Sequence, residues 1–216
     1  AGVIVEPVQG EGGVYVGKKE FFKFLREETK KRKIPLIFDE IQSGLGRCGE
    51  TFCYKIFKTK PDILTSGKAA GGGLPLGVTL ISDEYAKFYK KGDHASTFGG
   101  NPVSLSAGLQ VIRFLKNENN IKMIKEKGKI IKNKLDRLQK FFSDKIKEIR
   151  GVGLIWGIEF KNNVASIIRE KCIEKGLILN DARKNILRIL PPATIKKSEI
   201  DSGFKIIEDV LKEVFK

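Results

Sequence analysis

The sequence predicts an α/β fold in which a largely parallel sheet is followed by a smaller α+β domain. Three observations lead to this prediction. Short apolar runs alternate with amphipathic stretches in the first half, polar side chains follow the ends of these runs, and the pattern turns helical from about residue 104. A chain of 216 residues with 41% hydrophobic content is long enough to bury such a core.

The first half reads as short strands with a helix between the first two. Phe21, Phe22 and Leu25 give residues 18–32 an amphipathic helical pattern, and Pro35 marks its end. The predicted strands are Gly2–Val5, Leu36–Phe38, Ile63–Thr65 and Val78–Ile81.

The second half is predicted to begin with helices, the second of them long, basic and reaching to about residue 148. In this long helix, apolar residues recur at steps of three, four and seven, which places them on one face: Ile124, Ile131, Leu135, Leu138 and Phe142. The remaining elements are a strand over 151–160, a helix over 164–175, short strands over 177–180 and 186–190, and a helix over 198–215.

Polar residues stand at or just past the ends of three successive strands: Glu6, Asp39 and Lys68. Ligands of parallel sheets collect at the carboxyl ends of the strands, so we expect a site there. Lys68 lies in DILTSGKAAGGG, where small neighbours leave room for a flat ring and burial would favour the reactive neutral amine.

Several other patterns fail as functional motifs. GLGRCG at 44–49 matches the dinucleotide fingerprint formally, but it does not join a strand directly to a helix. The phosphate loop fails around Lys68 because Asp62 and Ala69 occupy required positions. His94 is the only histidine and no nucleophile elbow is present, so a surface or loop position is its better interpretation.

The net charge of +15 raises the possibility of a nucleic-acid partner. The lysines, however, fall on the solvated side of the long helix, and no zinc-finger, RNP-like or basic-zipper pattern occurs, so we expect neither nucleic acid nor membrane as a partner. Cys48, Cys53 and Cys172 indicate no disulfide framework and no zinc site, and they fit a reducing, cytoplasmic setting. A basic scaffold or nucleic-acid binder without catalysis is the alternative from another class.

A carboxylate, a lysine among small residues and the hydroxyl- and glycine-containing loop ASTFGGNP at 95–102 are the parts that pyridoxal 5'-phosphate chemistry needs. FDEIQSGLGRCG, PDILTSGKAAGGGLPLG, STFGGNP and LRILPPA follow one another along the chain. In these ordered motifs the sequence resembles the class III, ornithine-type aminotransferases of fold type I. The resemblance implies a fragment that lacks an amino-terminal part and is inactive alone. Its parts would be the later large domain (1–110), connecting helices (111–148) and a C-terminal small domain (149–216).

The resemblance also implies roles for single residues around the cofactor. Lys68 would be the lysine that binds pyridoxal phosphate, and Asp39 the partner of the pyridine nitrogen. Gln42 would approach the ring hydroxyl, with Glu40 and Ile41 along the cofactor.

Further roles concern the substrate and a second subunit. Thr97 would bind the cofactor phosphate of the neighbouring subunit of a homodimer with shared active sites, and Ser96 would lie near substrate. Arg188 would hold a substrate α-carboxylate, and Glu6, in VEPVQGEGG, would pair with it when that carboxylate is absent.

Within the family, HASTFGGNP and RGVGLIWGIEF most resemble enzymes that transfer the δ-amino group of N-acetylornithine to 2-oxoglutarate, a step of arginine biosynthesis. Enzymes acting on ornithine or 4-aminobutyrate share nearly all these motifs, so they remain alternatives.

Overall fold

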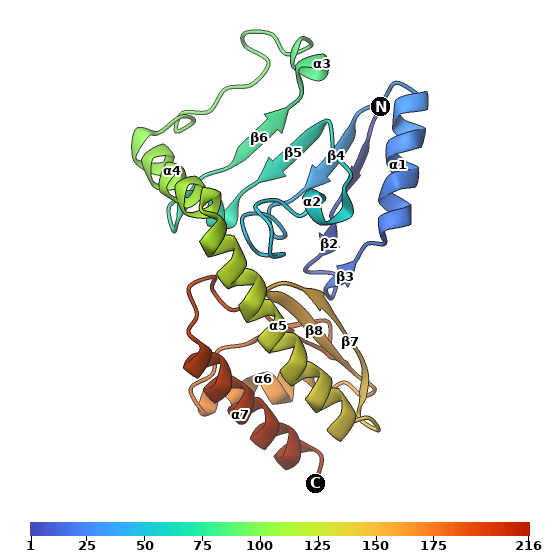
Figure 1. The fold of residues 1–216 in the computed structure, drawn as a ribbon, viewed down its shortest axis with the longest axis vertical. Coiled ribbons are helices and arrows are strands. Elements are labelled where there is room, and N and C mark those ends of the chain that lie inside the picture. Colours follow the sequence, from blue (N-terminus) through green and yellow to red (C-terminus); the bar gives the residue numbers. More distant parts are fainter. The chain divides into compact units, whose positions relative to one another are not determined.

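The computed structural model describes all 216 residues, and they form two compact units. The first unit consists of Ala1–Val8 and Gly17–Ile121, and the second of Gln9–Val16 and Lys122–Lys216 (Figure 1). The second unit therefore includes a short segment from early in the chain, which the sequence did not indicate. The predicted division at residues 110 and 148 stays a prediction.

A four-stranded sheet is the centre of the first unit, in the order β1-β4-β5-β6. Its strands are β1 (Val3–Val5), β4 (Leu36–Asp39), β5 (Ile63–Ser66) and β6 (Val78–Ile81). The first three are parallel, and β6 runs antiparallel to β5. The predicted, largely parallel sheet is thus confirmed, and the strands lie within a residue of their predicted bounds (Figure 1).

Aromatic packing joins α1 (Lys19–Lys31) to this sheet. The Phe22 ring lies 5.2 Å from that of Phe38 in β4 and 4.5 Å from that of Phe57 in α2 (Tyr54–Phe57). All three side chains are buried, so this cluster packs α1 and α2 against β4. The unit also contains η1 (Lys68–Gly71), α3 (Asp83–Ala86) and α4 (Pro102–Lys116).

An antiparallel sheet in the order β7-β8-β10-β9 forms the second unit. Its strands are β7 (Ile146–Val152), β8 (Ile155–Phe160), β9 (Asn180–Ala182) and β10 (Ile186–Ile189), and its helices are α5 (Glu118–Phe141), α6 (Ala165–Glu174) and α7 (Lys197–Val214). Every residue of β8 is buried, as in a strand covered on both faces. The short strands β2 (Val8–Gln9) and β3 (Tyr15–Val16) pair with each other.

The predicted apolar face of α5 is confirmed, since Ile124, Ile131, Leu135 and Leu138 are buried, as is Phe142 directly after the helix. Its predicted end near residue 148 was wrong, because the helix stops at Phe141 and β7 begins at Ile146. The edge strand β7 carries Lys147, Glu148 and Arg150, so its composition resembles that of the charged helix before it. The single strand predicted over 151–160 is instead a hairpin, which turns at Gly153 in the left-handed conformation. None of the helices combines the length and the apolarity that crossing a membrane requires.

Candidate functional site

The carboxyl edge of the first unit's sheet collects the three strand-end residues that the sequence singled out. Glu6 directly follows β1, Asp39 closes β4, and Lys68 opens the η1 turn after β5. These strands are neighbours in the sheet and parallel, so the same edge carries all three residues.

Asp39 is half-buried and accepts a hydrogen bond from the Ile41 amide at 3.0 Å on Oδ1. In the strand register it lies opposite Thr65, whose buried Oγ1 has no hydrogen-bond partner. Buried hydroxyls are nearly always hydrogen-bonded in proteins. The Thr65 hydroxyl could therefore form a hydrogen bond with a polar ligand beside Asp39.

Lys68 has a φ of +50°, in the left-handed region that residues other than glycine rarely adopt. The turn it opens is held by a hydrogen bond from the Ala70 amide to the Gly67 carbonyl at 3.0 Å. A Cβ on Gly67 would lie 3.4 Å from Ile41 Cγ2. The DEIQ stretch (residues 39–42) therefore lies against the lysine turn, η1, which Lys68 opens. The Lys68 side chain is exposed at this edge.

Glu40 points into the loop that follows rather than out of the sheet. Its buried carboxylate accepts hydrogen bonds from the backbone amides of Cys53 and Tyr54. Burial raises the pKa of Glu40 to about 7, against the lowering effect of the two amides. Glu40 thus ties the loop of residues 43–54 to the end of β4, and its contact with a cofactor stays a prediction.

The loop of residues 95–100 carries Ser96 and Thr97, both exposed. It leads to Asn101, the N-cap of α4, whose side chain accepts hydrogen bonds from the amides of Val103 and Ser104. His94 is exposed in the preceding turn, as predicted. The roles of Ser96 and Thr97 stay predictions.

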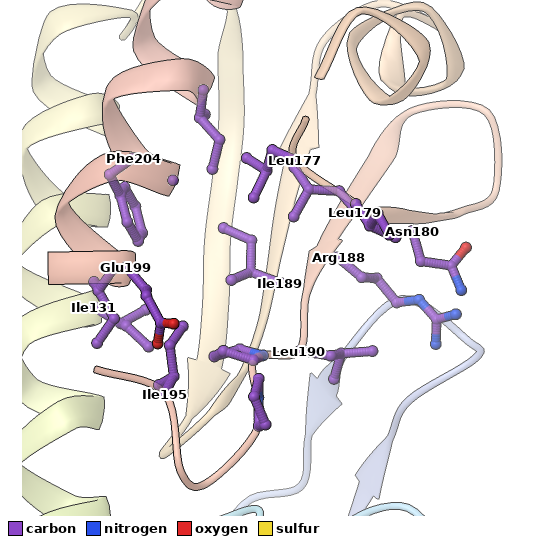
Figure 2. Close-up of a pocket in the computed structure, with 16 residues that line it drawn as sticks. Ile131, Leu177, Leu179, Asn180, Arg188, Ile189, Leu190, Ile195, Glu199 and Phe204 are labelled. Atoms are coloured by element: carbon purple, nitrogen blue, oxygen red, sulfur yellow. The ribbon is translucent and has the colours of Figure 1, made fainter. Parts of the chain in front are cut away.

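Arg188 belongs to the second unit, in the middle of β10, and its side chain is only 2% exposed. Its Nη1 contacts Oε1 of Glu11 at 2.8 Å, while its buried Nε has no hydrogen-bond partner. Figure 2 shows the Arg188 side chain leaving β10 and ending away from Phe204 and Glu199 of α7. Arg188 thus has a free Nε donor, and an incoming carboxylate could replace Glu11 on its Nη1.

Glu11 was missed by the sequence reasoning, which assigned the pairing with Arg188 to Glu6. The available signal was the second glutamate of VEPVQGEGG. Glu6 belongs to the first unit and Arg188 to the second, so the pairing of Glu6 with Arg188 stays a prediction. The carboxylate that the structure shows on Arg188 is that of Glu11.

An apolar pocket of about 440 Å³ adjoins Arg188 within the second unit (Figure 2). Leu177, Leu190 and Phe204 are among its lining residues, and Glu199 contributes one of its few polar groups. The Glu199 carboxylate accepts from the Lys196 amide at the start of α7, so it serves the helix end. Apart from Arg188, the pocket therefore offers a polar ligand little more than Asn180.

Comparisons with known proteins give one consistent result. The family described as "Aminotransferase class-III" matches residues 1–211. Acetylornithine aminotransferase of Methanocaldococcus jannaschii is 40% identical over the whole chain, which covers 54% of that protein. The corresponding protein of Aquifex aeolicus is 37% identical over 98% of the chain and 54% of its own length.

Solved structures show the same likeness. Ornithine aminotransferase of Toxoplasma gondii superimposes with a TM-score of 0.93 and 31% identity, over 99% of this chain and 52% of that one. Acetylornithine aminotransferase of Elizabethkingia anophelis gives a TM-score of 0.91 and 32% identity, over 99% and 57%. The chain spans about half the length of the curated relatives that it matches.

Proposed function

Since the chain belongs to the class III aminotransferase family, we propose that it forms the lysine- and arginine-bearing part of a pyridoxal-phosphate-dependent aminotransferase. One observation carries the proposal. Lys68 adopts a strained left-handed conformation among small residues, at the same sheet edge as Asp39. Strain of this kind in a residue with a reactive side chain is typical of functional sites.

The residues of this edge fit the cofactor. Gly67, Ala69 and the glycines that follow leave space for a flat ring, and the unpartnered Thr65 hydroxyl offers a polar contact in the row of Asp39. Bound pyridoxal phosphate supplies an aldehyde that reacts with amines and a protonated ring that withdraws electrons from the substrate carbon.

The chain's own residues would then bind and orient. Lys68 Nζ would hold the cofactor and would move a proton at the reacting carbon, and the Asp39 carboxylate would hold the proton on the pyridine nitrogen. Gln42 would approach the ring hydroxyl, and Ile41 and Glu40 would complete the DEIQ stretch (residues 39–42) along the cofactor. For Glu40 the role supported by its hydrogen bonds is to hold the loop behind this stretch.

Arg188 would orient substrates that carry an α-carboxylate. Glutamate and 2-oxoglutarate present such a group, whereas an amino donor that reacts through its distal amine presents methylene groups at the same place. A buried guanidinium without a counter-charge is costly. Glu11 supplies that charge at 2.8 Å and would leave Arg188 when a substrate carboxylate arrives.

The substrates would be N-acetylornithine and 2-oxoglutarate, with N-acetylglutamate semialdehyde and glutamate as products, as part of arginine biosynthesis. The support is the identity of about 40% with several proteins named acetylornithine aminotransferase. Ornithine aminotransferases among the solved neighbours support the alternative donor, ornithine, and the quoted motifs are shared with 4-aminobutyrate aminotransferases.

A homodimer with shared active sites completes the proposal. Ser96 and Thr97 lie exposed next to Phe98, which is 81% exposed, and Val103 on α4 is 66% exposed. Exposed apolar side chains of this size favour a protein partner over solvent. In such a dimer Thr97 would hold the cofactor phosphate of the neighbouring subunit, and Ser96 would lie near substrate. The three free, buried cysteines support a reducing, cytoplasmic setting.

The test uses protein expressed from its complete reading frame. The protein should absorb near the visible edge, lose that band on borohydride reduction, and carry the reduced cofactor on Lys68 by peptide mass spectrometry. Lys68→Ala should abolish both the band and transamination. Lys33→Ala is the matched control, because Lys33 is also exposed and left-handed (φ +54°) but follows the end of α1. Reduced cofactor on another lysine would overturn the assignment of Lys68. Comparing the transamination rates with N-acetylornithine, ornithine and 4-aminobutyrate identifies the amino donor.

A further inference from the structure

The segment Gln9–Val16, which carries Glu11, is docked on the sheet of the second unit by close packing. Val14 is completely buried, and a Cβ on Gly157 of β8 would lie 3.2 Å from Val14 Cβ and 3.3 Å from the Gly13 carbonyl. A Cβ on Gly13 would lie 2.6 Å from Ile186 Cδ1 of β10. Both glycines therefore allow a close approach that a side chain would prevent.

The backbone of this segment is strained where it makes the contact. Gly13 has a φ of +116° and Val14 a φ of +60°, and a β-branched residue in the left-handed region is a genuine outlier. The amides of Gly13 and Val14 both donate to the Gly10 carbonyl, at 3.2 and 3.3 Å. Such a conformation persists only when its surroundings hold it.

Arg150 of β7 supplies the polar part of that hold. Its side chain is 8% exposed, its Nε donates to the Gly13 carbonyl at 2.9 Å, and its guanidinium lies 3.9 Å from the centre of the Tyr15 ring. Its Nη1 donates to Glu159 at 2.6 Å and to Glu148 at 2.8 Å, so its charge is compensated. One guanidinium thus contacts the segment on both sides of Val14.

The ion pair between Glu11 and Arg188 cannot hold the segment by itself. The Glu11 side chain is 71% exposed, and an ion pair with an exposed partner contributes little to stability. The position of Glu11 must therefore be set by the backbone around it, and Gly13 lies only two residues further along the chain.

We infer that Arg150 is a positioning residue that fixes the turn of residues 10–14 through the Gly13 carbonyl and the Tyr15 ring, and so keeps Glu11 on Arg188. The inference rests on the proposed function, in which Glu11 neutralises Arg188 while an amino donor without an α-carboxylate reacts. Loss of Arg150 then leaves Arg188 uncompensated in that half-reaction. Glutamate brings its own carboxylate and needs no help from Glu11.

The test measures both half-reactions by single-turnover absorbance in the cofactor-loaded enzyme from the complete reading frame. Arg150→Met should slow the half-reaction of the ω-amine donor by at least about tenfold and that of glutamate by much less, because a charge-assisted hydrogen bond is lost. Hydrogen exchange of the Gly13 and Val14 amides should become faster in the same variant. Glu148→Gln is the matched control, since Glu148 is 53% exposed and accepts from Arg150 Nη1, not from the Nε that holds the Gly13 carbonyl. This variant should leave the ratio of the two half-reactions unchanged.

A double variant separates positioning from general destabilisation. In a Glu11→Gln background, Arg150→Met should change the ratio no further, because Arg150 acts through Glu11. Equal losses in both half-reactions, or an unchanged exchange rate at Gly13 and Val14, would overturn the inference. If Arg150→Met does not fold, Arg150→Lys takes its place and should change the ratio of the half-reactions in the same direction. Lysine keeps the charge but loses the planar stacking and the Nε donor. If Glu11→Gln alone leaves the ratio unchanged, the proposed exchange of carboxylates on Arg188 fails instead.

Discussion

Ionisation of Glu40 should make the stability of the protein fall as the pH rises from 5 to 8. The carboxylate is fully buried, and its pKa is raised from 4.5 to about 7, chiefly by burial. Between these two values the folded state keeps a proton that the unfolded state has lost. The free energy of unfolding therefore decreases with rising pH in this window. Below the window Glu40 is protonated in both states and has no effect, and above it the full cost of the buried charge lowers stability.

The size of the effect follows from the two pKa values. At about 1.36 kcal/mol per pH unit, a rise from 4.5 to about 7 corresponds to about 3 kcal/mol in total, of which about 2.5 kcal/mol develops between pH 5 and pH 8. Glutamine has the same shape and does not titrate, so Glu40→Gln should lack this component. It should also lose one of the two backbone hydrogen bonds, from Cys53 or Tyr54, because its amide nitrogen cannot accept.

Urea unfolding at pH 5, 6, 7 and 8 measures the effect as the difference in unfolding free energy between the wild type and Glu40→Gln. As the pH rises, the unfolding free energy of the wild type should fall relative to that of Glu40→Gln. Glu27→Gln, on the exposed surface of α1, serves as the control and should follow the wild type. A difference that stays constant over the whole range would show that burial does not govern Glu40, and that the two backbone amides keep it ionised.

Three further predictions concern the chemistry and its support. Asp39→Asn should keep the fold but lower turnover by orders of magnitude, because the ring nitrogen loses its proton; near-normal turnover at an unchanged melting temperature would refute this role. Arg188→Ala should impair the glutamate half-reaction far more than the ω-amine one, and Glu11→Gln should do the reverse by about 10- to 100-fold. If Glu6→Ala rather than Glu11→Gln gives that pattern, the role returns to Glu6. Gly108→Ala should lower stability by about 1–3 kcal/mol in thermal unfolding, because its Cβ would lie 2.9 Å from the Ala70 carbonyl; unchanged melting would contradict the packing of α4 on the lysine turn.

Periodicity predicted the elements whose burial repeats along the chain. The apolar face of α5 was read correctly because a helix of 24 residues repeats its pattern many times. The ends of β4 and β5 were also read closely, since buried runs there stop at polar residues or glycine. The half-exposed edge strand β7 gave no such pattern, and a shift in its register between Ile146 and Glu148 disturbs the alternation further.

The candidate site divides in the same way. The position of Asp39 and Lys68 at the sheet edge could be predicted because it depends on the strands that directly precede them, while their roles stay predictions. Glu40 was expected along the cofactor, but its surroundings depend on amides that arrive 13 and 14 residues later. The pairing of Glu11 with Arg188 joins residues 177 positions apart, so no local pattern could indicate it.

Backbone conformation sets Lys68 apart from the other lysines with a positive φ in a way that residue type does not. Lys33 and Lys58 also have positive φ values, but they terminate α1 and α2, where a left-handed residue is an ordinary way to end a helix. Lys68 and Val14 end no helix, and each costs about 1–3 kcal/mol that the surrounding structure must offset. For Lys68 this support comes from the packing of Gly108 against the turn. Lys68 is the proposed cofactor lysine, and Val14 lies three positions after the carboxylate on Arg188, so at these two places backbone strain coincides with a side chain that the proposed chemistry needs fixed. Leu45 and Arg183 also have positive φ values, but they lie in turns to which the proposal assigns no role.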